Sequence, residues 1–131
     1  MTQWPDPRRR LAILLWATDP ADPARCATPF FHALAAAAME VEVEIYFAGG
    51  AVRLLEPGVA ARLLTEPGGE ETVYGFIQRA AGLGVKFFAC PQAMAAHGVD
   101  PGRVIAECTG AAGATAFVAR ALDPSWSTLT Y

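Results

Sequence analysis

The sequence carries few charges and no long apolar run. Charged residues make up only 18% of its 131 residues, and the formal net charge is −3. A nucleic-acid-binding protein usually shows a basic patch, and the only basic cluster here is residues 8–10. No apolar run approaches the roughly 20 residues that a membrane-spanning helix requires. These deficits argue against a nucleic-acid partner and against a membrane span.

Cysteine is also scarce. It occurs only three times, as Cys26, Cys90 and Cys108, and no two cysteines form a CxxC pair. An odd number at wide spacing is not typical of a small secreted disulfide scaffold. A zinc site made from these cysteines with His32 or His97 would lack any ligand pair at a recognised spacing, so no metal is predicted. We expect reduced thiols that are either buried or reactive.

The first residues give no convincing targeting signal. Residues 8–10 are basic and residues 11–17 are apolar, which imitates a very short signal peptide. Residues 18–23, TDPADP, make a poor cleavage region, and the apolar run is the only candidate for a first strand. We therefore expect a cytoplasmic protein. Its length and its 53% hydrophobic content predict a single domain over residues 1–131, with residues 1–10 as a flexible lead-in.

The apolar patterns predict alternating strands and helices. Residues 11–17 form a continuous apolar run, typical of a strand buried on both faces of a parallel sheet. Residues 41–47 alternate strictly, which favours a half-exposed strand near a sheet edge. Further strands are expected at residues 85–89, 104–107 and 126–131, and helices at residues 30–40, 70–81, 91–97 and 111–122. This alternation predicts a three-layer α/β/α domain with a five-stranded, mainly parallel sheet in the flavodoxin-like order 2-1-3-4-5.

Each cysteine follows or ends a predicted strand. Cys26 lies in the loop after the first strand, Cys90 ends the third, and Cys108 ends the fourth. Sites in open parallel sheets lie beyond the carboxyl ends of the strands. In the expected strand order, all three thiols would share that edge of the sheet.

Cys90 is the strongest candidate for chemistry. Pro91 suits the first position of a helix, which leaves Cys90 at the N-cap. The partial positive charge of a helix N-terminus favours the thiolate, the form in which cysteine is a nucleophile. The alternative is an inert cysteine buried at the end of a strand, since unpaired cysteine is among the most buried residue types. Position alone leaves both interpretations open.

The sequence contains little that would favour a site for a phosphate-containing cofactor. Residues 110–113, GAAG, precede a predicted helix and could offer backbone N–H groups to an anion. They lack the Lys-Ser/Thr of a P-loop and the full dinucleotide-binding spacing. Asp19 and Asp22 in the first loop would repel a phosphate. No cofactor is predicted.

Three stretches resemble the DsrE/DsrF-like family of sulfur-relay proteins, which includes TusD-like and YchN-like members. They are IYFAGGAV at residues 45–52, GVKFFAC at residues 84–90 with its continuation to residue 99, and the end of the chain, from the Gly-rich turn into residues 117–122 and through the strand to residue 131. Their order and spacing carry the resemblance, which covers the chain from residue 11 onward.

The resemblance implies a function for Cys90. In the family, the cysteine at the end of the third strand carries a persulfide that passes between partners, and Cys90 matches that position. Cys26 and Cys108 are secondary candidates, since any internal hand-off of sulfur would have to use one of them. The resemblance further implies homo-oligomers, commonly trimers or hexamers, or complexes with related subunits, and sulfur donor and acceptor proteins as partners. The alternative is a non-catalytic oligomeric module that binds a small ligand or a partner protein.

Overall fold

The computed structural model describes residues 9–131, and residues 1–8 of the expected lead-in lie outside the described residues. The strands are β1 (Arg10–Leu15), β2 (Glu42–Phe47), β3 (Lys86–Ala89), β4 (Cys108–Ala111) and β5 (Trp126–Thr130). The α-helices are α1 (Thr28–Ala38), α2 (Val73–Gly82), α3 (Pro91–His97) and α4 (Ala114–Ala121). Short 3₁₀ helices are η1 (Pro23–Arg25), η2 (Gly49–Leu55) and η3 (Ala60–Arg62).

The five strands form one parallel sheet, which confirms the predicted fold class. Their order is β4-β3-β2-β1-β5, not the expected 2-1-3-4-5. The chain adds β2, β3 and β4 successively on one side of β1, and it then crosses the sheet through α4 to place β5 on the other side. The local pattern of each strand fixes its faces but not its neighbours, because strand pairing joins segments that are far apart in the chain.

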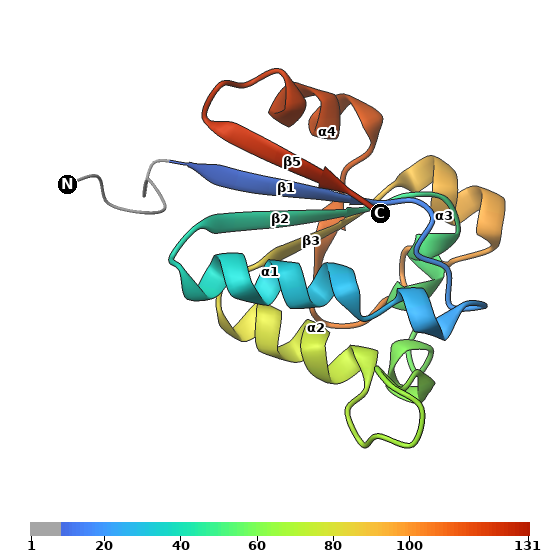
Figure 1. Ribbon diagram of the computed structural model, residues 1–131. Helices are drawn as coiled ribbons and strands as arrows, with labels where there is room; N and C mark the ends of the chain where they lie inside the picture. The colour runs from blue at the N-terminus through green and yellow to red at the C-terminus, as the bar shows by residue number, and fades with distance from the viewer. Residues whose placement is uncertain (1–8) are drawn as a thin grey trace.

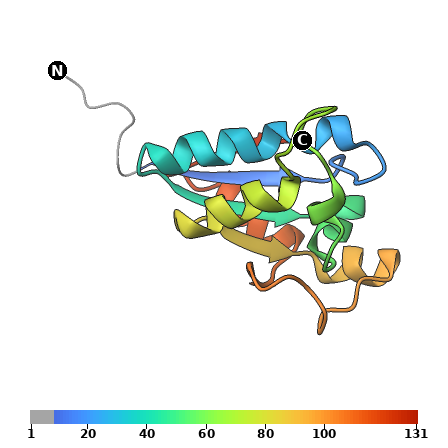
Figure 2. The same cartoon turned by 90° about the horizontal axis from the view of Figure 1, so that it is seen from below.

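The helices cover the two faces of the sheet unequally. Figures 1 and 2 show α1 and α2 side by side on one face, with α4 alone on the opposite face. The short helix α3 lies beyond the carboxyl ends of the strands, packed against η2. Among the described helices, none combines the length and the apolar character that crossing a membrane takes.

The main core lies between the sheet and the pair α1 and α2. Alternate residues of β1, β2 and β3 point into it. The fully buried ring of Phe47 packs there against Phe30 of α1 and against Phe87 of β3. Each such side chain contributes roughly 1.5–3 kcal/mol of hydrophobic free energy. This cluster also takes in Cys26.

The face beneath α4 holds a smaller cluster. Of residues 9–131, three form its buried part, namely Ala12, Tyr46 and Trp126, and no residue of α4 is fully buried. β2 was expected near a sheet edge, but it lies at the centre of the sheet, and Glu44 on this face is 3% exposed. Arg120 makes this burial possible by pairing with the Glu44 carboxylate.

The fourth strand begins later than expected. Residues 104–107 were predicted to form it, but they belong to a loop, and β4 is Cys108–Ala111. Ile105 is buried without joining the sheet, because its N–H donates to the carbonyl of Leu55 in η2. Apolar character at this position therefore reports packing against η2 and not strand pairing.

Candidate functional site

Cys90 lies at the junction of β3 and α3, as predicted. Its N–H donates to the carbonyl of Phe47 at 2.9 Å, and its own carbonyl accepts from the Met94 N–H at 3.0 Å. Cys90 is the N-cap residue of α3, and its side chain makes no capping hydrogen bond. The backbone is thus fixed by two elements while the half-buried thiol is left available.

The thiol borders an apolar cavity of about 370 Å³. Residues from β1, β2, the β4–α4 connection and α4 complete its wall. The lining residues are Leu14, Tyr46, Phe47, Ala48, Cys90, Ala112, Gly113, Ala114, Phe117 and Val118. The cavity lies on the thinly covered face of the sheet, with the carboxyl end of β3 at one side.

Tyr46 forms the aromatic floor of this cavity. Its ring stacks on Phe88 with 5.3 Å between centroids and meets Phe117 edge-on at 5.6 Å. Its hydroxyl donates to Glu44 Oε1 at 2.7 Å. Burial and this neighbouring carboxylate raise the pKa of Tyr46 to about 12. Tyr46 therefore stays neutral at physiological pH, and its proton is already committed to Glu44.

Gly113 leaves the thiol uncovered. A Cβ placed at Gly113 would lie 3.5 Å from Cys90 Sγ and 3.7 Å from Pro91 Cδ. The segment is held in position because the Ala112 N–H donates to the Ala89 carbonyl at 3.0 Å. The residues 110–113 that were considered for anion binding thus pass directly beside Cys90.

Cys26 is a core residue and not part of this cavity. It is fully buried, and its Sγ lies 3.4 Å from the Asp19 carbonyl and 3.5 Å from the Asp22 carbonyl. Burial, together with the carboxylates of Asp22 and Asp19, raises its pKa to about 11. These surroundings favour the neutral thiol, which is a poor nucleophile.

Cys108 starts β4 and does not end a strand, so the expectation that all three thiols share the carboxyl edge is wrong. It pairs in register with Phe87, three residues before Cys90. At about 3.3 Å per residue, this offset puts the two positions roughly 10 Å apart along the strand direction. Burial also raises the pKa of Cys108. The error follows directly from the shifted start of β4.

The two histidines that were considered as metal ligands do not line the cavity. His32 Nδ1 contacts the Tyr131 hydroxyl. His97 ends α3, and Gly98 closes the helix in the left-handed conformation. Within residues 9–131, no three His, Cys, Asp or Glu side chains come together as a metal site would require.

The sequence analysis missed the cavity. Tyr46 was expected in a half-exposed strand and Phe117 in a helix, and neither residue was assigned a place beside Cys90. The available signal was the position of Tyr46 close to the carboxyl end of its strand, because sites in open parallel sheets lie beyond these ends and ligand pockets are lined by aromatic side chains. Only the folded chain brings that segment next to Cys90.

Comparisons with known proteins agree with this architecture. The model of the DsrE/DsrF-like family matches residues 12–131. Among solved structures, the ychN protein from E. coli superposes with a TM-score of 0.75 at 14% identity, covering 94% of this chain and 99% of that chain. MTH1491 from Methanobacterium thermoautotrophicum, described as a protein of unknown function, gives a TM-score of 0.66 at 17% identity with the same coverage. No curated protein matches significantly. The structural likenesses bear on the fold alone.

Proposed function

The chain belongs to the DsrE/DsrF-like family, which is generally related to sulfur relay, and we propose that it carries sulfur as a persulfide on Cys90. The Cys90 thiolate attacks the outer sulfur of a donor persulfide R–S–SH. The new S–S bond forms as the donor S–S bond breaks, and the electron pair leaves with R–S⁻, which takes up a proton. An acceptor thiolate then attacks the outer sulfur of Cys90–S–SH and releases the Cys90 thiolate. No net oxidant is required.

One observation carries this proposal: of the three cysteines, Cys90 is the one that lines this apolar cavity. A persulfide carrier needs access for a donor and an acceptor, together with a protected place for the outer sulfur. The half-buried position of the thiol at the cavity wall fits both requirements.

Cys26 and Cys108 support this reaction less well. Their raised pKa values favour the neutral thiol, and neither lines the cavity. We therefore assign both a packing role and expect the sulfur of Cys90 to pass to a thiol on another protein.

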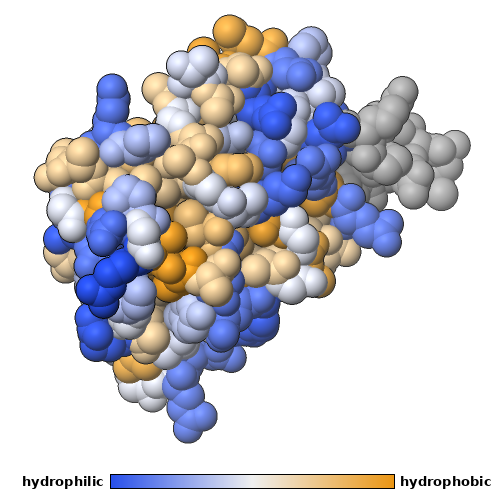
Figure 3. Space-filling view, turned by 180° about the vertical axis from the view of Figure 1, so that it is seen from behind, coloured by the Kyte–Doolittle hydropathy of each residue, from blue (hydrophilic) through white to orange (hydrophobic). Residues whose placement is uncertain are grey.

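We further propose that the carrier works in the cytoplasm as a homo-oligomer, a trimer or hexamer, or together with related subunits. Three unpaired cysteines fit a reducing compartment. Val118 of α4 and Leu122 just after it are 50% and 80% exposed, and an apolar surface of this kind suits a subunit contact. Figure 3 shows that hydrophobic residues are exposed in the middle and at the top of the face seen from behind, with hydrophilic residues to the left and right of the middle.

The alternative is a non-catalytic oligomeric module that binds a small ligand, with Cys90 as a packing residue. The cavity of about 370 Å³ also favours this function, because its volume falls in the range of small-molecule sites. The two functions differ in whether Cys90 gains sulfur.

The decisive test is the intact mass of the folded protein after incubation with a small uncharged organic persulfide such as benzyl persulfide. We expect a gain of ~32 Da per transferred sulfur, reversed by a reductant and absent in Cys90→Ser. Cys108→Ser is the matched control, since it removes a half-buried thiol outside the cavity, and it should keep the adduct. If sulfur is gained only after denaturation, the carrier function is wrong and the binding module is the better account.

A further inference from the structure

The cavity beside Cys90 has an unusual chemical character for a site that would receive a soluble sulfur compound. None of the ten residues that line it is charged, and aromatic and aliphatic side chains form most of its surface. The lining has only two polar side-chain groups, the Cys90 thiol and the Tyr46 hydroxyl. The first is the reacting group.

The Tyr46 hydroxyl is not available to a ligand's charged group. It donates to Glu44, and Arg120 occupies both oxygens of that carboxylate at 2.9 and 3.3 Å. The charges of Glu44 and Arg120 therefore compensate each other below Tyr46, which forms the floor of the cavity. A carboxylate or ammonium group placed in the cavity would lose its hydration without gaining a side-chain partner, and burying an unpaired charge is strongly unfavourable.

The size of the cavity also limits its occupant. A volume of about 370 Å³ is far larger than hydrogen sulfide needs, and it can accept a phenyl ring or a short alkyl chain. The rings of Tyr46 and Phe117, which meet edge-on, provide a wall on which an aromatic group can pack.

We propose that the sulfur donor of Cys90 is a small, uncharged organic persulfide, R–S–SH, whose aryl or alkyl group R occupies this cavity. This inference rests on the proposed carrier function and adds the class of the donor. The group R packs on Tyr46 and Phe117 and directs the outer sulfur to Cys90 Sγ. Transfer follows the balanced step above, so that RSH leaves as the product. Charged thiol persulfides are disfavoured because their charges find no partner in the cavity.

Three methanethiosulfonates that share one leaving group provide the test. Benzyl methanethiosulfonate is uncharged, the sulfonatoethyl reagent is anionic, and the trimethylammonioethyl reagent is cationic. In each case the Cys90 thiolate forms a disulfide with the R–S group and methanesulfinate leaves. Rates at Cys90 are followed by mass spectrometry of proteolytic peptides and are divided by the rates on cysteine in solution. We expect the corrected benzyl rate to exceed both others at least about tenfold, because only that group gains from apolar burial.

Two variants on the same stretch of α4 act as probe and control. Val118 lines the cavity and is 50% exposed, so Val118→Asp adds a charge to the wall at a position that tolerates it. This variant should lose the benzyl preference and should react faster with the cationic reagent. Ala119 of α4 is exposed and lies outside the lining, so Ala119→Asp should keep the wild-type preference. Thermal melting confirms that both variants fold.

The outcomes distinguish a failure of the carrier function from a failure of the proposed donor class. If Cys90 in the folded protein reacts with none of the reagents, the carrier function itself fails. If Cys90 reacts with all three at the ratio seen for cysteine in solution, the carrier function stands and the apolar donor is wrong. If the benzyl preference disappears at protein concentrations where the chain self-associates, a second copy fills the cavity and the inference is overturned.

Discussion

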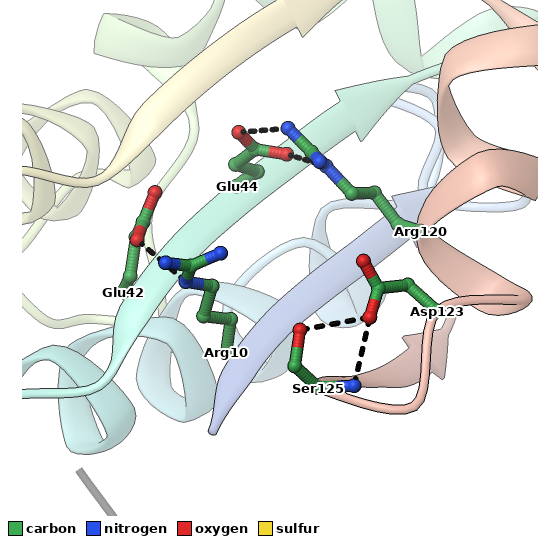
Figure 4. A network of polar contacts seen from close by, with 6 residues as sticks. All are labelled: Arg10, Glu42, Glu44, Arg120, Asp123 and Ser125. Atoms are coloured by element: carbon green, nitrogen blue, oxygen red, sulfur yellow. Dashed lines mark hydrogen bonds and ion pairs between the residues drawn. The ribbon is translucent and has the colours of Figure 1, made fainter. Parts of the chain in front are cut away.

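Arg120 of α4 forms an ion pair with Glu44 of the central strand β2, on the face of the sheet that α4 covers. Arg120 Nε donates to Glu44 Oε1 at 2.9 Å, and Arg120 Nη2 donates to Glu44 Oε2 at 3.3 Å (Figure 4). The same guanidinium stacks over the Trp126 ring at 4.3 Å. Because no residue of α4 is fully buried, this pair is a principal attachment of the helix that walls the cavity.

Arg120→Met is expected to lower the free energy of unfolding by about 2–4 kcal/mol, because it leaves the Glu44 carboxylate buried with only the Tyr46 hydroxyl as a partner. Arg79→Met is the control. Arg79 pairs with Glu71 where both side chains are half exposed, and the expected loss is below about 1 kcal/mol. Urea unfolding measures both. Equal losses in the two variants would contradict the anchoring role of Glu44 and Arg120.

Gly113→Ala is expected to slow the alkylation of Cys90 roughly several-fold while leaving stability nearly unchanged. The added methyl would lie 3.5 Å from Cys90 Sγ, an ordinary contact distance that narrows access without forcing a clash. Gly110→Ala is the matched control, since a Cβ there meets nothing within 4 Å. Iodoacetamide kinetics with peptide mass spectrometry gives the rates. An unchanged rate in Gly113→Ala would show that reagents reach the thiol from another side.

The free energy of unfolding is expected to fall at alkaline pH because the Cys26 thiol is buried. Its pKa is raised to about 11 in the folded protein from an ordinary value of 9, so the unfolded chain releases this proton first. The contribution of the neutral thiol is therefore fully present below pH 9 and is lost as pH rises through 11. In Cys26→Ala, the free energy of unfolding should fall less steeply across that window than in the wild type. Parallel curves for the two proteins would refute this assignment.

Glu40→Gly is expected to raise the free energy of unfolding by about 1 kcal/mol. Glu40 follows α1 with a φ of 65°, a left-handed conformation that glycine adopts without steric cost. Its side chain is exposed, so the substitution removes no core packing. Thermal and urea unfolding measure the change. A decrease in stability would mean that the Glu40 side chain makes a contribution larger than the backbone strain.

Much of the architecture follows from local patterns. The apolar run of residues 11–17 and the alternation of residues 41–47 identify β1 and β2, and Pro91 after Cys90 predicts the start of α3. These features depend on neighbouring residues alone: strand faces on a two-residue period, and helix starts on proline and capping residues. The same local rules failed at Ile105, whose apolar side chain is buried against η2 instead of in a strand.

The sequence by itself determined that this protein is a parallel α/β domain with Cys90 at the junction of a strand and a helix. Only the tertiary structure decided the strand order, separated Cys108 from the carboxyl edge, and buried Glu44 beside an arginine 76 residues away. It also created the cavity, whose walls come from four distant segments. The physical reason is that pairing, burial and cavities depend on which faces meet in space, whereas periodicity and turn chemistry act between neighbours in the chain.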